Sequence, residues 1–191
     1  RHDDGNPLIH ALKERNGFSI TPFWKGRIMS RAEQNIDKMG FASDCFDYCL
    51  PIPSSSLFCH EVAQMVADKL GSPLLDPDFF RKKTTSEMLR GLRASPPKVR
   101  KGARSAYTTQ LHSWQTLPAD TICEAKRVDT TIRLYFDFFI AQGVQPNLQD
   151  KKIVIVDDIF SSGSSVLSVR NIVQNQLGAE VSYISFLSGL R

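Results

Sequence analysis

The run Ile153-Val154-Ile155-Val156 restricts the possible folds more than any other feature, because four β-branched residues in succession predict a strand that is buried on both faces. Strands of this kind occur in parallel sheets that helices cover on both sides. Asp157 and Asp158 follow directly and are expected to end the strand. A serine-rich turn around Gly163 then leads into an apolar-periodic helix, predicted over 166–177. This order of elements predicts an α/β protein.

The turn after the strand has the chemistry of a phosphate site. Its sequence is Ser161-Ser162-Gly163-Ser164-Ser165, and it stands at a helix N-terminus, where unpaired backbone N–H groups and the helix dipole favour an anion. Asp157 and Asp158 cannot hold the same phosphate, because like charges repel; they suit sugar hydroxyls or a hydrated divalent cation. The alternative is a plain helix cap, which needs only one acid or hydroxyl.

Residues 153–165 resemble the PRPP-binding motif of the type I phosphoribosyltransferases (PRTases). That motif is an apolar strand, two acidic residues, an apolar residue, any residue and a Thr/Ser-rich turn around Gly, and the chain matches it with Ser in place of the commoner Thr. The resemblance implies that Asp157 and Asp158 hold the ribose hydroxyls of PRPP (5-phosphoribosyl 1-diphosphate), and that Ser161, Ser162, Gly163, Ser164 and Ser165 hold its 5′-phosphate. The other common nucleotide motifs, GxxxxGK[ST] and GxGxxG, do not occur in the chain.

The expected fold class is α/β: a doubly wound, mostly parallel sheet flanked by helices, as in type I PRTases, with a small helical N-terminal hood or extension. The chain has 191 residues, and we expect the hood in residues 1–44 and the PRTase-like core in residues 45–191. Apolar periodicity and breakers predict helices over 6–13, 28–39, 57–70 and 130–142, and strands over 44–52, 74–75, 79–80 and 181–187.

Two further segments gain a role from the resemblance. Pro53-Ser54-Ser55-Ser56 follows the first predicted core strand, where the family binds the pyrophosphate of PRPP; a serine helix cap is the alternative interpretation. Arg81-Lys82-Lys83 stands where many members begin a mobile basic loop that closes over the leaving pyrophosphate. We therefore expect a flexible basic loop at about residues 81–105, with Arg81, Lys82 and Lys83 among the catalytic residues.

The charge of the chain is concentrated in this basic segment. Residues 81–104 hold nine Lys and Arg against the single acid Glu87, a net charge of +8 in a chain of +4, which leaves −4 for the rest. Such a segment indicates a polyanionic partner, either a substrate phosphate or nucleic acid, although a solvated basic face explains the charge equally well. Prolines interrupt the segment and no aromatic residue lies within it, which argues against single-stranded nucleic acid as its only ligand.

The function that the resemblance implies is transfer of the phosphoribosyl group from PRPP to an unidentified nitrogenous acceptor, with release of pyrophosphate. Mg²⁺ is the expected cofactor, held by Asp157 and Asp158 through water. Ser161 replaces the Asp that PRTases acting on hypoxanthine or guanine usually carry, so that subgroup is not indicated. The alternative is a non-catalytic module of the same fold that senses PRPP or a nucleotide, or binds nucleic acid through residues 81–104.

Within the family, the serine turn and the basic segment are similar to the ComF-like branch, but the N-terminal zinc-binding cysteines of that branch are missing. Cys45, Cys49 and Cys59 with His60 do not have the spacing of a common zinc site, so buried free thiols in a reducing cytosol are the expectation. No apolar run is long enough to span a membrane. We expect a cytoplasmic protein without a membrane partner; a homodimer is compatible with the sequence.

Overall fold

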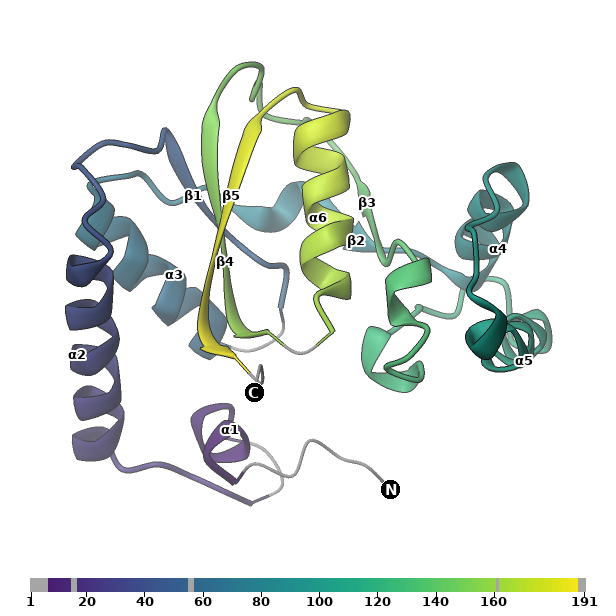
Figure 1. Cartoon of the computed structure of the whole chain (residues 1–191), viewed down its shortest axis with the longest axis horizontal. Coiled ribbons are helices and arrows are strands. Elements are labelled where there is room, and N and C mark those ends of the chain that lie inside the picture. The colour runs from purple at the N-terminus through teal and green to yellow at the C-terminus, as the bar shows by residue number, and fades with distance from the viewer. Residues whose placement is uncertain (1–6, 15–16, 55–56, 161, 189–191) are drawn as a thin grey trace.

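The computed structural model describes residues 7–14, 17–54, 57–160 and 162–188. Figure 1 shows an α/β core and a lobe that extends from it. In chain order the helices and longer strands are α1 (Pro7–Leu12), α2 (Pro22–Lys38), β1 (Tyr48–Pro51), α3 (Leu57–Leu70), β2 (Phe80–Lys82), α4 (Thr85–Ala94), α5 (Arg104–Gln115), β3 (Phe139–Ala141), β4 (Lys152–Phe160), α6 (Ser164–Asn175) and β5 (Glu180–Ser188). Short 3₁₀ turns lie at Pro77–Phe79, Lys101–Ala103, Ala125–Arg127 and Arg133–Tyr135.

The core is a three-stranded parallel sheet in the order β1-β4-β5. Strand β4 lies in the middle, and Ile153, Val154, Ile155 and Val156 are all fully buried in it. The sequence-based prediction of a parallel-sheet strand buried on both faces is therefore confirmed. The prediction of an α/β protein, with helices that flank its sheet, is also confirmed.

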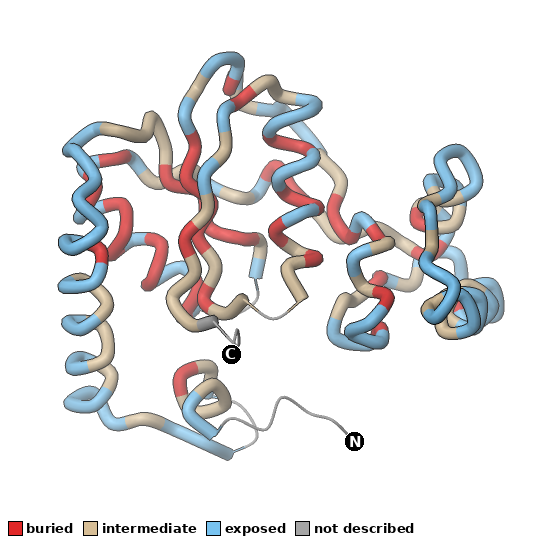
Figure 2. Tube along the Cα trace, in the orientation of Figure 1, coloured by how far each residue is buried: buried red, intermediate tan, exposed pale blue. Residues whose placement is uncertain are grey.

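Alternate residues of β4 belong to two different hydrophobic clusters, one on each face of the sheet. Val154 and Val156 pack with the buried face of α3, whereas Ile153 and Ile155 pack with residues of α6. Helix α2 lies outside α3, and α6 covers the other side of the sheet (Figure 1). Figure 2 shows many buried residues in β1, β4 and α3, whereas most of β5 is intermediate or exposed. Helices thus cover both faces of this small sheet.

The predicted helices agree with the structure wherever a cap and an apolar face coincide. Helix α3 covers 57–70 as expected, and α6 begins two residues earlier than predicted. Helix α2 starts at Pro22 rather than at residue 28, because Thr21 caps it by accepting a hydrogen bond from the Trp24 N–H and Pro22 suits the first helical turn. The residue expected to cap the first helix, Asn6, lies outside the described part of the chain.

The predicted helix over 130–142 is wrong. The segment contains a 3₁₀ turn at Arg133–Tyr135 and then strand β3, which pairs antiparallel with β2. Ile132, Phe136, Phe138 and Phe139 are buried, whereas Leu134 is exposed; the Phe136 ring packs edge-on against Trp114 of α5, with centroids 4.7 Å apart. The Phe138 N–H donates to Ser168 Oγ of α6 at 2.8 Å, which ties the segment to the core. A dense run of aromatic residues suits a strand as well as a helix, and tertiary pairing decided between them.

Strands β2 and β3 lead into a lobe that contains α4 and α5 (Figure 1). Most of its surface is exposed (Figure 2). Among the described residues, no helix is both long and apolar enough to span a lipid bilayer.

Candidate functional site

The candidate site lies at the carboxyl edge of the parallel sheet, where ligands of α/β proteins usually bind. The Ile52 N–H donates to the Val156 carbonyl oxygen at 2.8 Å, so the end of β1 lies beside the start of the acid pair. The turn after β4 leads into α6 at the same edge (Figure 1). Pro53 and Ser54 thus follow directly after a residue that is bonded beside the acid pair. Ser55, Ser56 and Ser161 lie outside the described residues.

The prediction that Asp157 and Asp158 end the strand is wrong. Strand β4 continues to Phe160, because β5 keeps pairing with it, with Asp157 opposite Ser185 and Phe160 opposite Ser188. The acids therefore lie within hydrogen-bonded backbone, and Asp158 is buried, with a relative exposure of 3%. A buried carboxylate needs a partner, because moving an ion from water into a protein interior costs several kcal/mol.

That partner is Lys13, which sequence reasoning missed. The Lys13 Nζ lies 2.9 Å from each carboxylate oxygen of Asp158, and the two side chains are 14% and 4% exposed. The residues are 145 positions apart in the chain. The only sequence signal was indirect: two adjacent acids after a buried strand need a positive charge, but nothing in the sequence indicates which one.

Asp157 has an unusual protonation equilibrium. Burial, together with the nearby charge of Asp158, raises the pKa of Asp157 to about 7. Tyr183 of β5 lies nearby, its ring 5.7 Å from that of Phe160, and burial raises the pKa of its hydroxyl, so it stays a neutral phenol. Near neutral pH the site therefore carries one paired carboxylate and one carboxyl that readily gains or loses a proton.

The turn that opens α6 leaves its helix N-terminus available to a ligand. Gly163 is the N-cap with φ of +72°, and as a glycine it has no side chain with which to cap the helix. The first N–H groups of an α-helix have no partner within the helix, so they point toward a potential anion. Ser162 Oγ and Ser164 Oγ lie 3.0 Å apart across the turn. This arrangement can bind a phosphate group.

Glycine is required at residue 163 for two reasons. Its left-handed conformation is one that other residues rarely adopt. A Cβ there would also lie 3.1 Å from two ring carbons of Phe160. The close approach of the turn to Phe160 therefore depends on the missing side chain.

The predicted flexible loop is not what the structure shows. Arg81 and Lys82 belong to β2, and residues 85–94 form α4. Arg81 donates through both terminal nitrogens to Glu87, at 2.7 and 2.5 Å, while Glu87 completes a capping box with Thr84. The guanidinium and the Thr84 N–H lower the pKa of Glu87 to about 2. These contacts order the segment, because the cap fixes the start of α4 and the ion pair joins that helix to β2.

None of the three basic residues reaches the acid pair through a hydrogen bond or ion pair among the described residues. Arg81 is held by Glu87, and Lys82 lies 3.9 Å from Glu124. Lys83 donates its backbone N–H to Phe138, and its ammonium has no acid partner within the described part of the chain. Of the three, Lys83 is therefore the one whose charge is available to a ligand.

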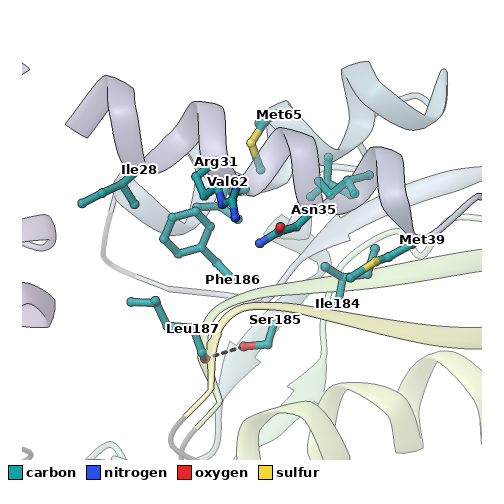
Figure 3. Close-up of a pocket in the computed structure, with 13 residues that line it drawn as sticks. Ile28, Arg31, Asn35, Met39, Val62, Met65, Ile184, Ser185, Phe186 and Leu187 are labelled. Atoms are coloured by element: carbon teal, nitrogen blue, oxygen red, sulfur yellow. Dashed lines mark hydrogen bonds between the residues drawn. The ribbon is translucent and has the colours of Figure 1, made fainter. Parts of the chain in front are cut away.

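A separate cavity of about 280 Å³ lies between α2, α3 and β5. Figure 3 shows Ile28, Met39, Met65 and Phe186 around it, with the polar side chains of Arg31 and Asn35 contributed by α2. Its lining is mainly apolar, and it includes neither Asp157 nor Asp158. It is not the predicted site.

The cysteines are placed as side chains of the core. Cys49, Cys59 and Cys123 are buried, and burial raises the pKa of both Cys49 and Cys59 to about 12, so these thiols remain protonated at neutral pH. Over residues 7–14, 17–54, 57–160 and 162–188, no three His, Cys, Asp or Glu side chains converge as a metal site. Mg²⁺ requires fewer protein ligands, since it usually retains several waters and binds through one or two carboxylates. Asp157 and Asp158 fit that donor set, provided that Lys13 gives way.

No protein-family model matches this chain, and no curated protein matches it either. The resemblance of residues 153–165 to the PRPP-binding motif thus stays a prediction from sequence.

Proposed function

We propose that this protein is a phosphoribosyltransferase of the doubly wound type I fold, which binds PRPP and transfers its phosphoribosyl group to a nitrogenous acceptor. One observation carries the proposal. An acid pair near the carboxyl end of the buried strand β4 is followed by a helix whose N-cap is a left-handed glycine without a capping side chain. This combination provides hydroxyl acceptors and a phosphate site at one edge of one sheet.

Each part of PRPP has a matching group at this edge. The amides at the start of α6 and the hydroxyls of Ser162, Ser164 and Ser165 bind the 5′-phosphate. Asp157 and Asp158 accept hydrogen bonds from the ribose hydroxyls, which fixes the ribose ring. The segment after β1, with Pro53 and Ser54, follows the strand that lies on the side of β4 opposite β5, and it meets the pyrophosphate.

In this reaction the protein contributes positioning and electrostatic stabilisation rather than covalent catalysis. A nitrogen nucleophile displaces pyrophosphate from C1 of the ribose, and negative charge builds up on the leaving group. Mg²⁺ would neutralise part of that charge when it is bound by the acid pair through water. Lys83 supplies a positive charge to the pyrophosphate, whereas Arg81 first has to leave Glu87.

The proposal is tested by calorimetric titration of PRPP with Mg²⁺ into the wild type and into Gly163→Ala. We expect the wild type to bind and Gly163→Ala to bind at least about tenfold more weakly, because the added methyl group strains the turn that presents the amides. Gly143→Ala is the matched control, since Gly143 also has positive φ but meets no atom within 4 Å. Absence of binding at millimolar PRPP, or equal binding by both glycine variants, would contradict the proposal.

A second candidate function, binding of nucleic acid, rests on the charge of the extended lobe. Its exposed cations have no acid partner among the described residues; they are Arg90, Arg93, Lys98, Arg100, Lys101 and Arg104. They lie on consecutive segments of the chain from α4 to the start of α5. A cluster of unpaired cations attracts a polyanion without base recognition.

A salt titration with a short DNA duplex checks this candidate. Each contacted phosphate contributes about −0.9 to the slope of log affinity against log salt concentration. The double variant Arg90→Gln/Arg93→Gln is therefore expected to reduce the slope by about 2. Lys25→Gln serves as control, because Lys25 is paired with Glu61 on the core. Binding with no salt dependence, or a slope that the double variant leaves unchanged, would exclude the lobe as the interface.

A further inference from the structure

Helix α1 docks on the carboxyl edge through its last turn. Leu12 is 4% exposed and belongs to the cluster that covers the α3 face of the sheet. Lys13 continues the helical turn, with its N–H donating to the Ile9 carbonyl at 3.1 Å, and its ammonium reaches Asp158. Figure 1 shows α1 below the ends of β4 and β5.

The ammonium of Lys13 occupies the place that a ligand of the acid pair requires. Both oxygens of Asp158 lie 2.9 Å from Nζ, so the whole carboxylate faces one cation. A hydrated divalent cation or a ribose hydroxyl needs at least one of these oxygens. Two cations cannot share them at contact distance, because like charges repel more strongly in a buried site than in water.

The hold of α1 on the core is small. The helix has six residues, too few to be stable on its own, and Leu12 is its one buried residue. Leu12 and the ion pair between Lys13 and Asp158 anchor it to the core, and the His10 ring also stacks on Phe18, with centroids 5.8 Å apart. A ligand that takes over Asp158 removes the ion pair from that attachment.

We propose that Lys13 is an exchangeable counter-ion of the acid pair, and that α1 is a latch that a divalent cation displaces from the carboxyl edge. The exchange of Lys13 for a cation rests on the acid pair alone. Its extension to PRPP, whose ribose needs the same carboxylates, rests on the proposed function.

The first test is the affinity for Mn²⁺, measured by electron paramagnetic resonance of the free ion. We expect Lys13→Met to bind Mn²⁺ at least about tenfold more tightly than the wild type, since the competing charge is gone. Lys13→Arg keeps a cation and is expected to stay close to the wild type. Lys25→Met is the matched control, a lysine that is ion-paired with Glu61 away from Asp158. Equal affinity of Lys13→Met and the wild type, or no Mn²⁺ binding by either, would overturn the proposal.

The second test uses the wild type and reports on α1 directly. Lys13 is a trypsin site that the docked helix shields, so saturating Mn²⁺ is expected to accelerate cleavage after Lys13. Cleavage after the exposed Lys98 provides the internal standard. If Mn²⁺ leaves the rate of cleavage after Lys13 unchanged relative to that after Lys98, the latch does not open. A change in Mn²⁺ affinity in Lys13→Met would then reflect only the loss of a charge.

The same digestion separates this inference from the proposed function. PRPP that binds in the calorimeter without exposing Lys13 refutes the latch and leaves the function standing. Mn²⁺ that exposes Lys13 in a protein that does not bind PRPP supports the exchange and refutes the function.

Discussion

Asp157→Asn combined with Asp158→Asn is expected to reduce PRPP-dependent pyrophosphate release by at least about 100-fold, because hydrogen bonds to charged acceptors are worth about 1.5–3 kcal/mol each. Asparagine keeps the size of each side chain but removes the negative charge to which we assign the ribose and the cation. The measurement is the initial rate of pyrophosphate formation with a panel of nitrogenous acceptors. Single variants separate the two roles, since Asp157 is about half protonated at pH 7, whereas Asp158 is paired with Lys13.

A stability effect has to be separated from this loss of activity. Asp158→Asn leaves the largely buried ammonium of Lys13 without its counter-ion, which destabilises the attachment of α1. Asp37→Asn is the matched control, because Asp37 also pairs with a lysine, Lys69, but on the outer surface of α2 and α3. Pyrophosphate release that persists in the double variant would exclude these aspartates as the ribose site, whatever the acceptor.

The part of the fold predicted from sequence is the part that local rules determine. Four β-branched residues fix a buried strand, and the periodicity of 57–70 and of the segment after Gly163 fixes α3 and α6. The same rules predicted that the acid pair and the serine-rich turn lie at the same edge of the sheet. Each of these inferences needs only a few neighbouring residues.

The predictions that failed depend on distant parts of the chain. Strand β4 continues through Asp157 because β5, some thirty residues later, supplies partners; charge alone would have ended it. Residues 139–141 form a strand because β2 is available to pair with them. Arg81 lies in a strand because it pairs with Ile140 of β3, some sixty residues later. Such contacts leave no periodic trace in the sequence.

Lys13 illustrates the same limit at the candidate site. It stands in a polar N-terminal stretch, and its role follows only from the position of Asp158. The sequence could predict that buried acids require a counter-charge, but the chain has 24 Lys and Arg residues from which to choose. Identification of the partner required the tertiary structure.

The second large effect concerns stability and pH. The pKa of Asp157 is about 7 in the folded protein, above the ordinary value of 3.8, because burial and the charge of Asp158 disfavour its ionised form. Between these two pH values the folded protein keeps a proton that the unfolded chain has already lost. Stability therefore falls as the pH rises through this window, by up to about 1.4 kcal/mol for each pH unit. Below this window the stabilisation that comes from the raised pKa of Asp157 is fully present, and above pH 7 it is lost.

Asp157→Asn removes this titration, so the free energy of unfolding of the wild type should fall relative to that of the variant by about 2 kcal/mol from pH 5 to pH 7. Urea unfolding of both proteins, followed by tryptophan fluorescence at each pH, measures the difference. Glu87→Gln gives the opposite control: its pKa of about 2 lies below the ordinary value, so Glu87 is ionised in both states over this range. Its replacement should lower stability by the same amount at every pH above 5. Parallel curves for both variants would show that Asp157 is an ordinary carboxylate and that the acid pair is already fully charged.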